Sequence, residues 1–138
     1  MRPGPLDMRM DPVDTELTAA DIVNWYSSNQ LEKIFIENGE TFAARIASEI
    51  CKYRSHKLIQ TTTELAEIAW KTKNVHPATK MFQALRITVN DELNQIKEGL
   101  KIAFDRLHDG GLLIAVSFHA LEDTIVKEFF RSCSLCKP

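Results

Sequence analysis

The segment that most constrains this chain is Leu112–Ser117, an apolar run with no partner strand elsewhere in the sequence. It follows the Gly110-Gly111 turn and shows no alternation of polar and apolar residues. Such a run is typical of a parallel β-strand that is covered on both faces. A single buried strand leaves its backbone N–H and C=O groups unpaired, which is costly. We therefore expect one buried strand near 111–118 and interpret the chain as the later part of a larger α/β protein, whose other strands lie upstream.

The composition is that of a globular protein, with 138 residues, 44% hydrophobic and 26% charged, and a net charge of −2. This balance gives no general attraction to nucleic acid, so an RNA-binding surface must be local. No apolar run approaches the ~20 residues of a membrane span, and we expect no membrane partner. Cys133 and Cys136 form a lone C-x-x-C pair, too few ligands for a zinc site, so we expect no bound metal.

Most of the chain before the apolar run is predicted to be helical. Thr18, Ser27 and Thr61 each begin a capping-box pattern, because Asp, Gln or Glu follows three positions later. The apolar spacing then predicts a module of four short helices, over 19–26, 28–37, 40–54 and 62–72. Both tryptophans, Trp25 and Trp70, are expected in the core of this module rather than as stacking surfaces for bases.

A long amphipathic helix is predicted next, from Pro77 onward. Apolar residues recur every three or four positions from Phe82 to Leu107 and form one stripe along the helix. Another helix is predicted over Leu121–Arg131. Helix, glycine turn, buried strand and helix form the repeating unit of a doubly wound sheet. We expect the boundary between the helical module and this α/β part near Asn74–His76.

The residues after the predicted strand are the first candidates for chemistry. Ligands of open α/β sheets bind at the carboxyl ends of the strands, where this chain carries His119 and Asp123. Both are candidate catalytic residues, because a histidine and a carboxylate can move protons or bind a polar substrate. The alternative is structural: Ser117 caps the following helix, and Glu122 and Asp123 stabilise its first turn.

The N-terminal loop Gly4–Asp11 is too apolar for an ordinary linker. We expect it to line a pocket, with Arg9 contacting a phosphate or carboxylate. The alternative is a loop packed on the core with an Arg–Asp pair. Lys80 and Arg86 on the long helix are either phosphate contacts or part of a solvated face. No glycine-rich dinucleotide loop, P-loop or H-E-x-x-H motif occurs in the sequence.

Several motifs occur in one order along the chain. They are Gly4-Pro5-Leu6-Asp7-Met8-Arg9-Met10-Asp11, Ala20-Asp21-Ile22-Val23-Asn24, His76-Pro77-Ala78-Thr79-Lys80, Phe82–Ile87, Val89–Leu93, Ser117–Asp123 and Ile125-Val126-Lys127. Over residues 4–131 the chain closely resembles the MraW (RsmH) family, the cytosine-N4 methyltransferases of small-subunit ribosomal RNA and their mitochondrial relatives. The resemblance implies an α/β parent, a Rossmann-like class I methyltransferase that depends on S-adenosylmethionine and carries an all-α insert.

The resemblance also implies a domain division. Residues 1–13 form a loop of the methyltransferase domain, 14–75 the helical insert, similar to a sterile-alpha-motif bundle, and 76–138 a helix-strand-helix part of the methyltransferase domain. The family's glycine-rich cofactor loop lies upstream, so no cofactor-binding residue is expected here and the isolated chain is expected to be inactive. Ala120 and Thr124 stand where the family usually carries Ser and Arg.

For the parent enzyme, the resemblance implies small-subunit ribosomal RNA as partner. Candidates to position the cytosine are Asp7, Asp11, His119 and Asp123, and candidates for phosphate contacts are Arg9, Lys80 and Arg86. A homodimer is one expected assembly. The expected location is the cytoplasm if the source is bacterial and the mitochondrial matrix if the chain is a mitochondrial relative. Two other readings remain open: a non-catalytic helical module that binds RNA or protein through 18–75, and a separate chain that supplies the cofactor half.

Overall fold

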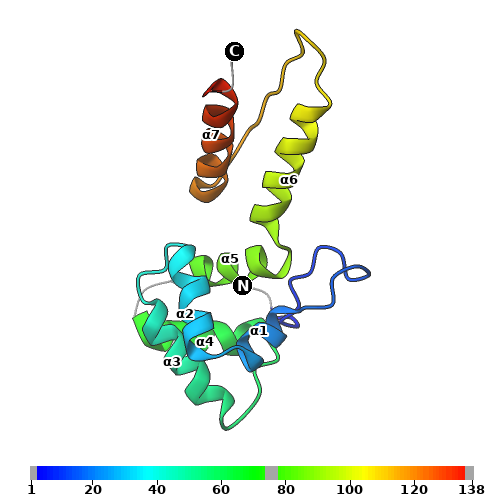
Figure 1. The fold of residues 1–138 in the computed structure, drawn as a ribbon. Helices are drawn as coiled ribbons and strands as arrows, with labels where there is room; N and C mark the ends of the chain where they lie inside the picture. Colours follow the sequence, from blue (N-terminus) through cyan, green and yellow to red (C-terminus); the bar gives the residue numbers. More distant parts are fainter. Residues whose placement is uncertain (1–2, 74–77, 136–138) are drawn as a thin grey trace. The chain divides into compact units, whose positions relative to one another are not determined.

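The computed structural model describes residues 3–73 and 78–135 (Figure 1). The chain divides into two compact units, Met1–Asn90 (unit 1) and Asp91–Pro138 (unit 2). The helices assigned in unit 1 are α1 (Ala19–Trp25), α2 (Ser28–Glu37), α3 (Ala43–Arg54), α4 (Thr62–Lys73) and α5 (Ala78–Val89). Those of unit 2 are α6 (Glu92–Asp105) and α7 (Ala120–Leu135). None of the helices in the described ranges is long and apolar enough to span a membrane.

The predicted capping boxes are confirmed. Thr18 accepts a hydrogen bond from the backbone N–H of Asp21, whose carboxylate accepts one from the N–H of Thr18. Ser27 and Gln30 form the same reciprocal pair at the start of α2. Thr61 and Glu64 do so before α4. Each box satisfies backbone donors that a helix start leaves free, which fixes where these helices begin.

The predicted helix bounds hold closely for α1, α2 and α4, and less well for α3. α3 begins at Ala43 rather than at residue 40. Gly39 has a φ of 72°, which ends α2, and Phe42 at the N-cap has non-helical dihedral angles. The Glu40 side chain accepts a hydrogen bond from the N–H of Phe42 at 3.0 Å. This local bond competes with helix formation and delays the start of α3.

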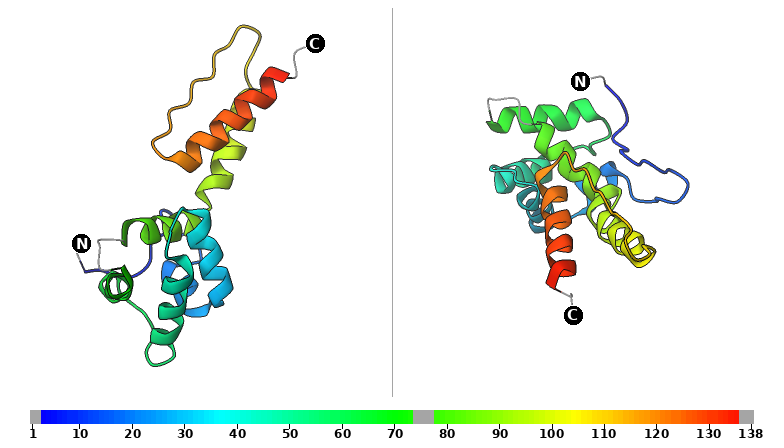
Figure 2. Two further views of the ribbon diagram at one scale, coloured as in Figure 1. Left: turned by 90° about the vertical axis from the view of Figure 1, so that its left-hand side faces the viewer. Right: turned by 90° about the horizontal axis from the view of Figure 1, so that it is seen from above.

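The core of unit 1 is shared by all five helices and by the N-terminal loop. α2 packs against α3 and α5, and α3 packs against α4 (Figures 1 and 2). Leu6 brings the loop into this core and is 2% exposed. The same cluster contains fully buried side chains from the helices and their connections, among them Ile22, Leu31, Phe35, Ile46, Ile50, Ile59, Leu65 and Leu85.

Backbone hydrogen bonds hold the N-terminal loop at two places. Leu6 donates to the carbonyl of Gln60 and Thr62 donates to that of Gly4, both at 3.0 Å. These bonds surround an isolated β-bridge between Pro5 and Thr61. On the other side, the first residues of α1 donate to the carbonyls of Asp7 and Leu6 at 2.8 Å. The loop is therefore an integral part of the helical unit.

The expectation that both tryptophans are core residues is wrong. Trp25 is 70% exposed and Trp70 is 54% exposed. Trp70 directly follows Ala69 on a helix whose inward side is already filled by Leu65, Ile68 and Ala69. Trp25 lies two positions after the buried Val23 on α1. A step of one residue turns a helix by about 100°, which carries Trp70 away from the core.

The single long helix predicted from Pro77 onward is interrupted. α5 ends at Val89 and α6 begins at Glu92, and Asp91 between them is left-handed, with φ 49° and ψ 38°. Asp is one of the few residues besides glycine that adopts this conformation at low cost. The apolar period continues through the break, which is why the pattern alone does not reveal it. The predicted boundary at Asn74–His76 lies outside the described residues.

The predicted strand is also wrong for the described structure. Residues 111–117 carry no helix or strand assignment, and the connection from α6 to α7 runs as an open loop (Figure 2). Its large apolar side chains face solvent: Leu112, Ile114, Val116 and Phe118 are 86%, 81%, 76% and 96% exposed. A β-strand is stabilised by its ladder to a neighbouring strand, and no strand is assigned among the described residues.

Substitutions of Leu31 and Ile36, both on α2, test the packing of the unit 1 core. Leu31 is fully buried, whereas Ile36 is 57% exposed. We expect Leu31→Ala to lower the free energy of unfolding by about 2–5 kcal/mol, since it leaves a cavity. Ile36→Ala is the matched control, with an expected loss below about 1 kcal/mol. Urea denaturation of both variants measures the difference, and equal losses would contradict this packing.

The ionisation of Glu64 makes the free energy of unfolding of unit 1 depend on pH. Its carboxylate accepts hydrogen bonds from Lys57 at 2.5 Å and from the backbone N–H of Gln60 at 2.9 Å. These bonds, the lysine first, lower the pKa of Glu64 from 4.5 to about 2. Between these values the unfolded chain binds the proton and the folded chain does not, so this contribution to stability falls as pH drops from 4.5 to 2.

We expect Glu64→Gln to flatten the dependence of the free energy of unfolding on pH in that window. Glu67→Gln, at an exposed position on the same helix, is the control. Denaturant titrations across the pH range measure both. An unchanged slope in Glu64→Gln would show that the carboxylate is not held as described.

Candidate functional site

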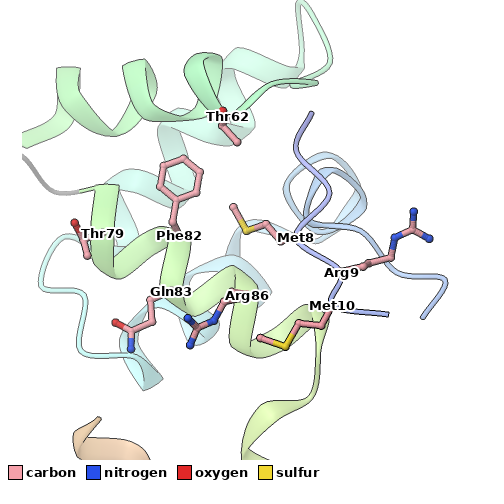
Figure 3. A pocket seen from close by; sticks show the side chains of 8 residues that line it. All are labelled: Met8, Arg9, Met10, Thr62, Thr79, Phe82, Gln83 and Arg86. Atoms are coloured by element: carbon pink, nitrogen blue, oxygen red, sulfur yellow. The ribbon is translucent and has the colours of Figure 1, made fainter. Parts of the chain in front are cut away.

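Unit 1 contains a pocket of about 550 Å³ between the N-terminal loop, the start of α4 and one side of α5 (Figure 3). Its size falls in the range of pockets that take small organic ligands. The residues that line it are Met8, Arg9, Met10, Thr62, Thr79, Phe82, Gln83 and Arg86. The prediction that the N-terminal loop lines a pocket is therefore confirmed by the lining residues of the loop.

The side chains of the loop alternate in direction. Figure 3 shows the thioethers of Met8 and Met10 extending toward α5, while the guanidinium of Arg9 turns away from it. Phe82 of α5 faces the same space and is 8% exposed. Two thioethers and an aromatic ring thus form apolar walls. Gln83 and Arg86, on the same helix, add an amide and a guanidinium at one side.

Asn90 holds the loop against α5, although it was not among the site residues predicted from the sequence. Its Oδ1 accepts a hydrogen bond from the N–H of Met10 at 2.7 Å, and its Nδ2 donates to the carbonyl of Met8 at 2.9 Å. The same Nδ2 donates to the carbonyl of Arg86, one turn earlier on α5, at 2.8 Å. Met8 has a φ of 65°, a left-handed backbone that few non-glycine residues adopt. Two signals in the sequence point to Asn90, its place at the end of a helix and its place in the motif Val89–Leu93.

Arg9 is bound within its own loop. Its Nε and Nη2 donate to the two carboxylate oxygens of Asp7 at 2.7 and 2.9 Å, and Nη1 donates to the carbonyl of Thr15 at 3.0 Å. The hydrogen bonds from Arg9 lower the pKa of Asp7 to about 2, and the same pairing raises the pKa of Arg9. These contacts are those of the structural alternative, an Arg–Asp pair. A phosphate contact by Arg9 stays a prediction.

The other candidates of unit 1 have different surroundings. Asp11 accepts hydrogen bonds from the N–H groups of Val13 and Asp14, which forms a local turn. Lys80 donates to the carbonyl of Gly39 at 2.9 Å. Arg86 lines the pocket together with Arg9, whereas Asp11 and Lys80 are not among its lining residues. Their roles toward RNA stay predictions.

His119 and Asp123 lie at the start of α7 in unit 2. His119 occupies the position before the first helical residue, and its carbonyl accepts from the N–H of Asp123 at 2.9 Å. Its Nδ1 faces the N–H of Leu121 at 3.4 Å, and Asp123 pairs with Lys127 at 2.6 Å. These contacts fit the structural alternative, with His119 rather than Ser117 at the cap. A catalytic role for either residue stays a prediction.

The described residues offer no metal centre, since they contain no group of three or more His, Cys, Asp or Glu side chains that could hold an ion. Cys133 is half-buried, and Cys136 lies outside the described ranges. The described part also lacks the strand-to-helix glycine turn that holds nucleotide cofactors, since no strand is assigned there.

Comparison with known proteins assigns the chain to a family. Residues 1–137 match the MraW methylase family. Proteins named ribosomal RNA small subunit methyltransferase H from Persephonella marina, Caldicellulosiruptor bescii and Syntrophotalea carbinolica are 49%, 51% and 46% identical to it. The alignments cover 94%, 94% and 98% of this chain, but 47%, 44% and 46% of those proteins.

The chain belongs to the MraW methylase family, as the sequence motifs predicted. It spans somewhat less than half the length of the curated relatives that it matches. The pocket and the Asn90 contacts both lie within the matched residues.

The Asp7–Arg9 pair can be tested by titration. We expect Arg9→Ala to raise the pKa of Asp7 from about 2 toward the ordinary value of 3.8, because the main cause of the lowered pKa is lost. Carbon-13 NMR of the Asp7 carboxyl carbon measures the pKa directly. Arg45→Ala, at an exposed position on α3, should leave it unchanged. A low pKa that persists in Arg9→Ala would refute the pairing.

Proposed function

We propose that this chain is part of an S-adenosylmethionine-dependent methyltransferase that modifies N4 of a cytidine in small-subunit ribosomal RNA. The observation that carries the proposal is the match of residues 1–137 to the MraW methylase family. Identities of 46–51% to proteins named ribosomal RNA small subunit methyltransferase H support the same assignment. The proposal assigns the methyl donor to the part of those relatives that this chain does not match.

The chemistry defines what these residues have to provide. The exocyclic amine of cytosine is a poor nucleophile because its lone pair is conjugated with the ring. The enzyme must hold it in line with the methyl group, and orientation carries much of the rate. Carboxylates are natural acceptors for the N4–H groups, and the base has to leave any stacked helix first. A surface for an unstacked base is therefore the expected contribution of this chain.

Each candidate residue has a proposed role toward the RNA substrate that takes account of the contacts described above. Asp7, held ionised by Arg9, and Asp11 are proposed hydrogen-bond acceptors near the base. Arg86, in the pocket lining, and Lys80, on the same helix, are proposed phosphate contacts. His119 and Asp123 are proposed to contact the substrate from unit 2. Lys80 and Asp123 would exchange their present partners, Gly39 and Lys127, for RNA.

A chimera tests the proposal. The matching residues of the Persephonella marina relative, 49% identical over 138 aligned positions, are replaced by this chain. We expect the chimera to produce N4-methylcytidine in small-subunit ribosomal RNA, detected by mass spectrometry of digested nucleosides. The 138-residue chain alone is expected to yield none. The unmodified relative is the positive control.

Two outcomes would contradict the proposal. A folded chimera that binds S-adenosylmethionine but methylates no cytidine would show that this chain cannot serve the reaction. Methylation at another atom of the base would refute the N4 assignment. Circular dichroism and a thermal melt of the chimera separate both outcomes from simple misfolding.

A second candidate function is a non-catalytic helical module that binds RNA. It is favoured by the closed hydrophobic core of unit 1 and by the exposed Trp25, which offers an aromatic face to an unpaired base. RNA binding by the 138-residue chain together with an inactive, folded chimera would select this function. An active chimera would select methyl transfer.

A further inference from the structure

We propose that Met10 is a site of reversible oxidation and that its sulfoxide closes the unit 1 pocket by accepting a hydrogen bond from Arg86. The inference goes beyond the proposed function, because neither step needs RNA or a methyl donor. It is carried by the exposure of Met10 in the pocket lining and by the Asn90 amide, which links the backbones of Met10 and Arg86.

The methionines at positions 8, 10 and 81 differ in their access to solvent. Met10 is 67% exposed, whereas Met8 is partly buried against the core and Met81 is fully buried. Oxidation of a side-chain sulfur in a protein depends on its exposure. Among these three residues, Met10 is therefore the one that a peroxide reaches first. Because Met10 lies outside the core cluster, its oxidation leaves the packing of that cluster intact.

The oxidation step balances with a hydroperoxide as the oxidant. A lone pair of the Met10 sulfur attacks one oxygen of hydrogen peroxide, which forms the S–O bond and breaks the O–O bond. The hydroxide that leaves takes up the proton of the transferred oxygen and is released as water. The sulfur loses two electrons, the peroxide gains them, and an apolar thioether becomes a polar sulfoxide.

The sulfoxide adds a hydrogen-bond acceptor to an apolar wall of the pocket. A thioether sulfur is only a weak acceptor, so reduced Met10 presents an apolar surface. Figure 3 shows its side chain extending toward α5, the helix that brings Gln83 and Arg86 to the same pocket. Arg86 carries five N–H donors and a charge, and charge-assisted hydrogen bonds are roughly twice as strong as neutral ones. Arg86 is therefore preferred over the Gln83 amide as the partner.

Asn90 keeps the backbone of Met10 close to the helix that carries this donor. Its Oδ1 accepts a hydrogen bond from the N–H of Met10 at 2.7 Å, and its Nδ2 donates to the carbonyl of Arg86 at 2.8 Å. One amide thus joins the backbones of two residues whose side chains line the same pocket. A bond between those side chains needs rotation about their own torsion angles and no movement of the loop. The bond then closes the pocket on the side where both residues lie.

The order of oxidation tests the site. The 138-residue chain is treated with hydrogen peroxide and then digested with trypsin. Cleavage after Arg9 and Lys80 places Met8, Met10 and Met81 in three different peptides, and fragment mass spectra locate the added oxygen. We expect Met10 to be oxidised first, Met8 later and Met81 last. Oxidation of Met8 or Met81 at the rate of Met10 or faster would overturn the proposal.

The guanidinium signals of Arg86 test the hydrogen bond. In the chain oxidised at Met10, we expect nitrogen-15 NMR to show a shift of these signals. Their N–H exchange with water should slow by roughly twofold to tenfold, as expected for one added hydrogen bond. Nuclear Overhauser contacts between the Met10 methyl group and the Arg86 side chain should appear at the same time. Arg86 signals that stay unchanged after complete oxidation of Met10 would refute the closure.

Met10→Leu removes the oxidisable sulfur and keeps an apolar side chain of similar volume. We expect peroxide to leave the Arg86 signals of this variant unchanged. Met8→Leu is the matched control in the same loop and should respond as the unmodified chain does. A response that persists in Met10→Leu, or that is lost in a folded Met8→Leu variant, contradicts the proposal. The two measurements on the unmodified chain stay decisive if either variant fails to fold.

Reversibility is tested with methionine sulfoxide reductase and a thiol. We expect the enzyme to restore reduced Met10 together with the original Arg86 signals, whereas the thiol alone should restore neither. Thiols reverse disulfides and sulfenic acids of cysteine, so recovery with the thiol alone would trace the change to the cysteines and overturn the proposal. Met10 that stays oxidised in the presence of the enzyme would refute the reversible step.

Discussion

Burial of Leu6 is the contact on which the N-terminal loop and its pocket depend. The side chain is 2% exposed and joins the core formed by α1–α5. Residues on both sides of it share backbone hydrogen bonds with the 60–62 segment and with the start of α1. A loop held in this way can present Met8 and Met10 in a fixed geometry, which a solvated linker cannot do. The core thus determines the position of the pocket as well as stability.

Several charged side chains of unit 1 are paired with residues close to them in the sequence. Asp7 and Arg9 neutralise each other within three residues of chain, and Glu64 is satisfied by Lys57 and by backbone N–H groups. Asp21 is tied to the Thr18 hydroxyl and N–H, which lowers its pKa. These charges shape turns and helix starts. In the proposed reaction, the positive charge offered to an RNA phosphate therefore comes from α5, through Arg86 and Lys80, rather than from a general basic surface.

The features that depend on local chemistry could be predicted from the sequence. Three capping boxes, the bounds of α2 and the inclusion of the N-terminal loop in a pocket follow from residue types at short spacing. The break at Asp91 could not be predicted, because the spacing of apolar residues continues through a single left-handed residue. The exposure of Trp25 could not be predicted either, because the spacing does not show which side of a helix already packs against the core. Asn90 was missed because its partners lie 80 and 82 positions away in sequence.

The open connection before α7 has a consequence for the 138-residue chain when it is produced alone. From Gly110 to Phe118 the chain carries no charged residue and no proline, and several of its large apolar side chains face solvent. Segments of this composition lack the gatekeeper residues that discourage intermolecular association. They are also the surfaces that chaperones and proteases engage when they sort chains. When the 138-residue chain is produced alone, we therefore expect this segment to promote its self-association.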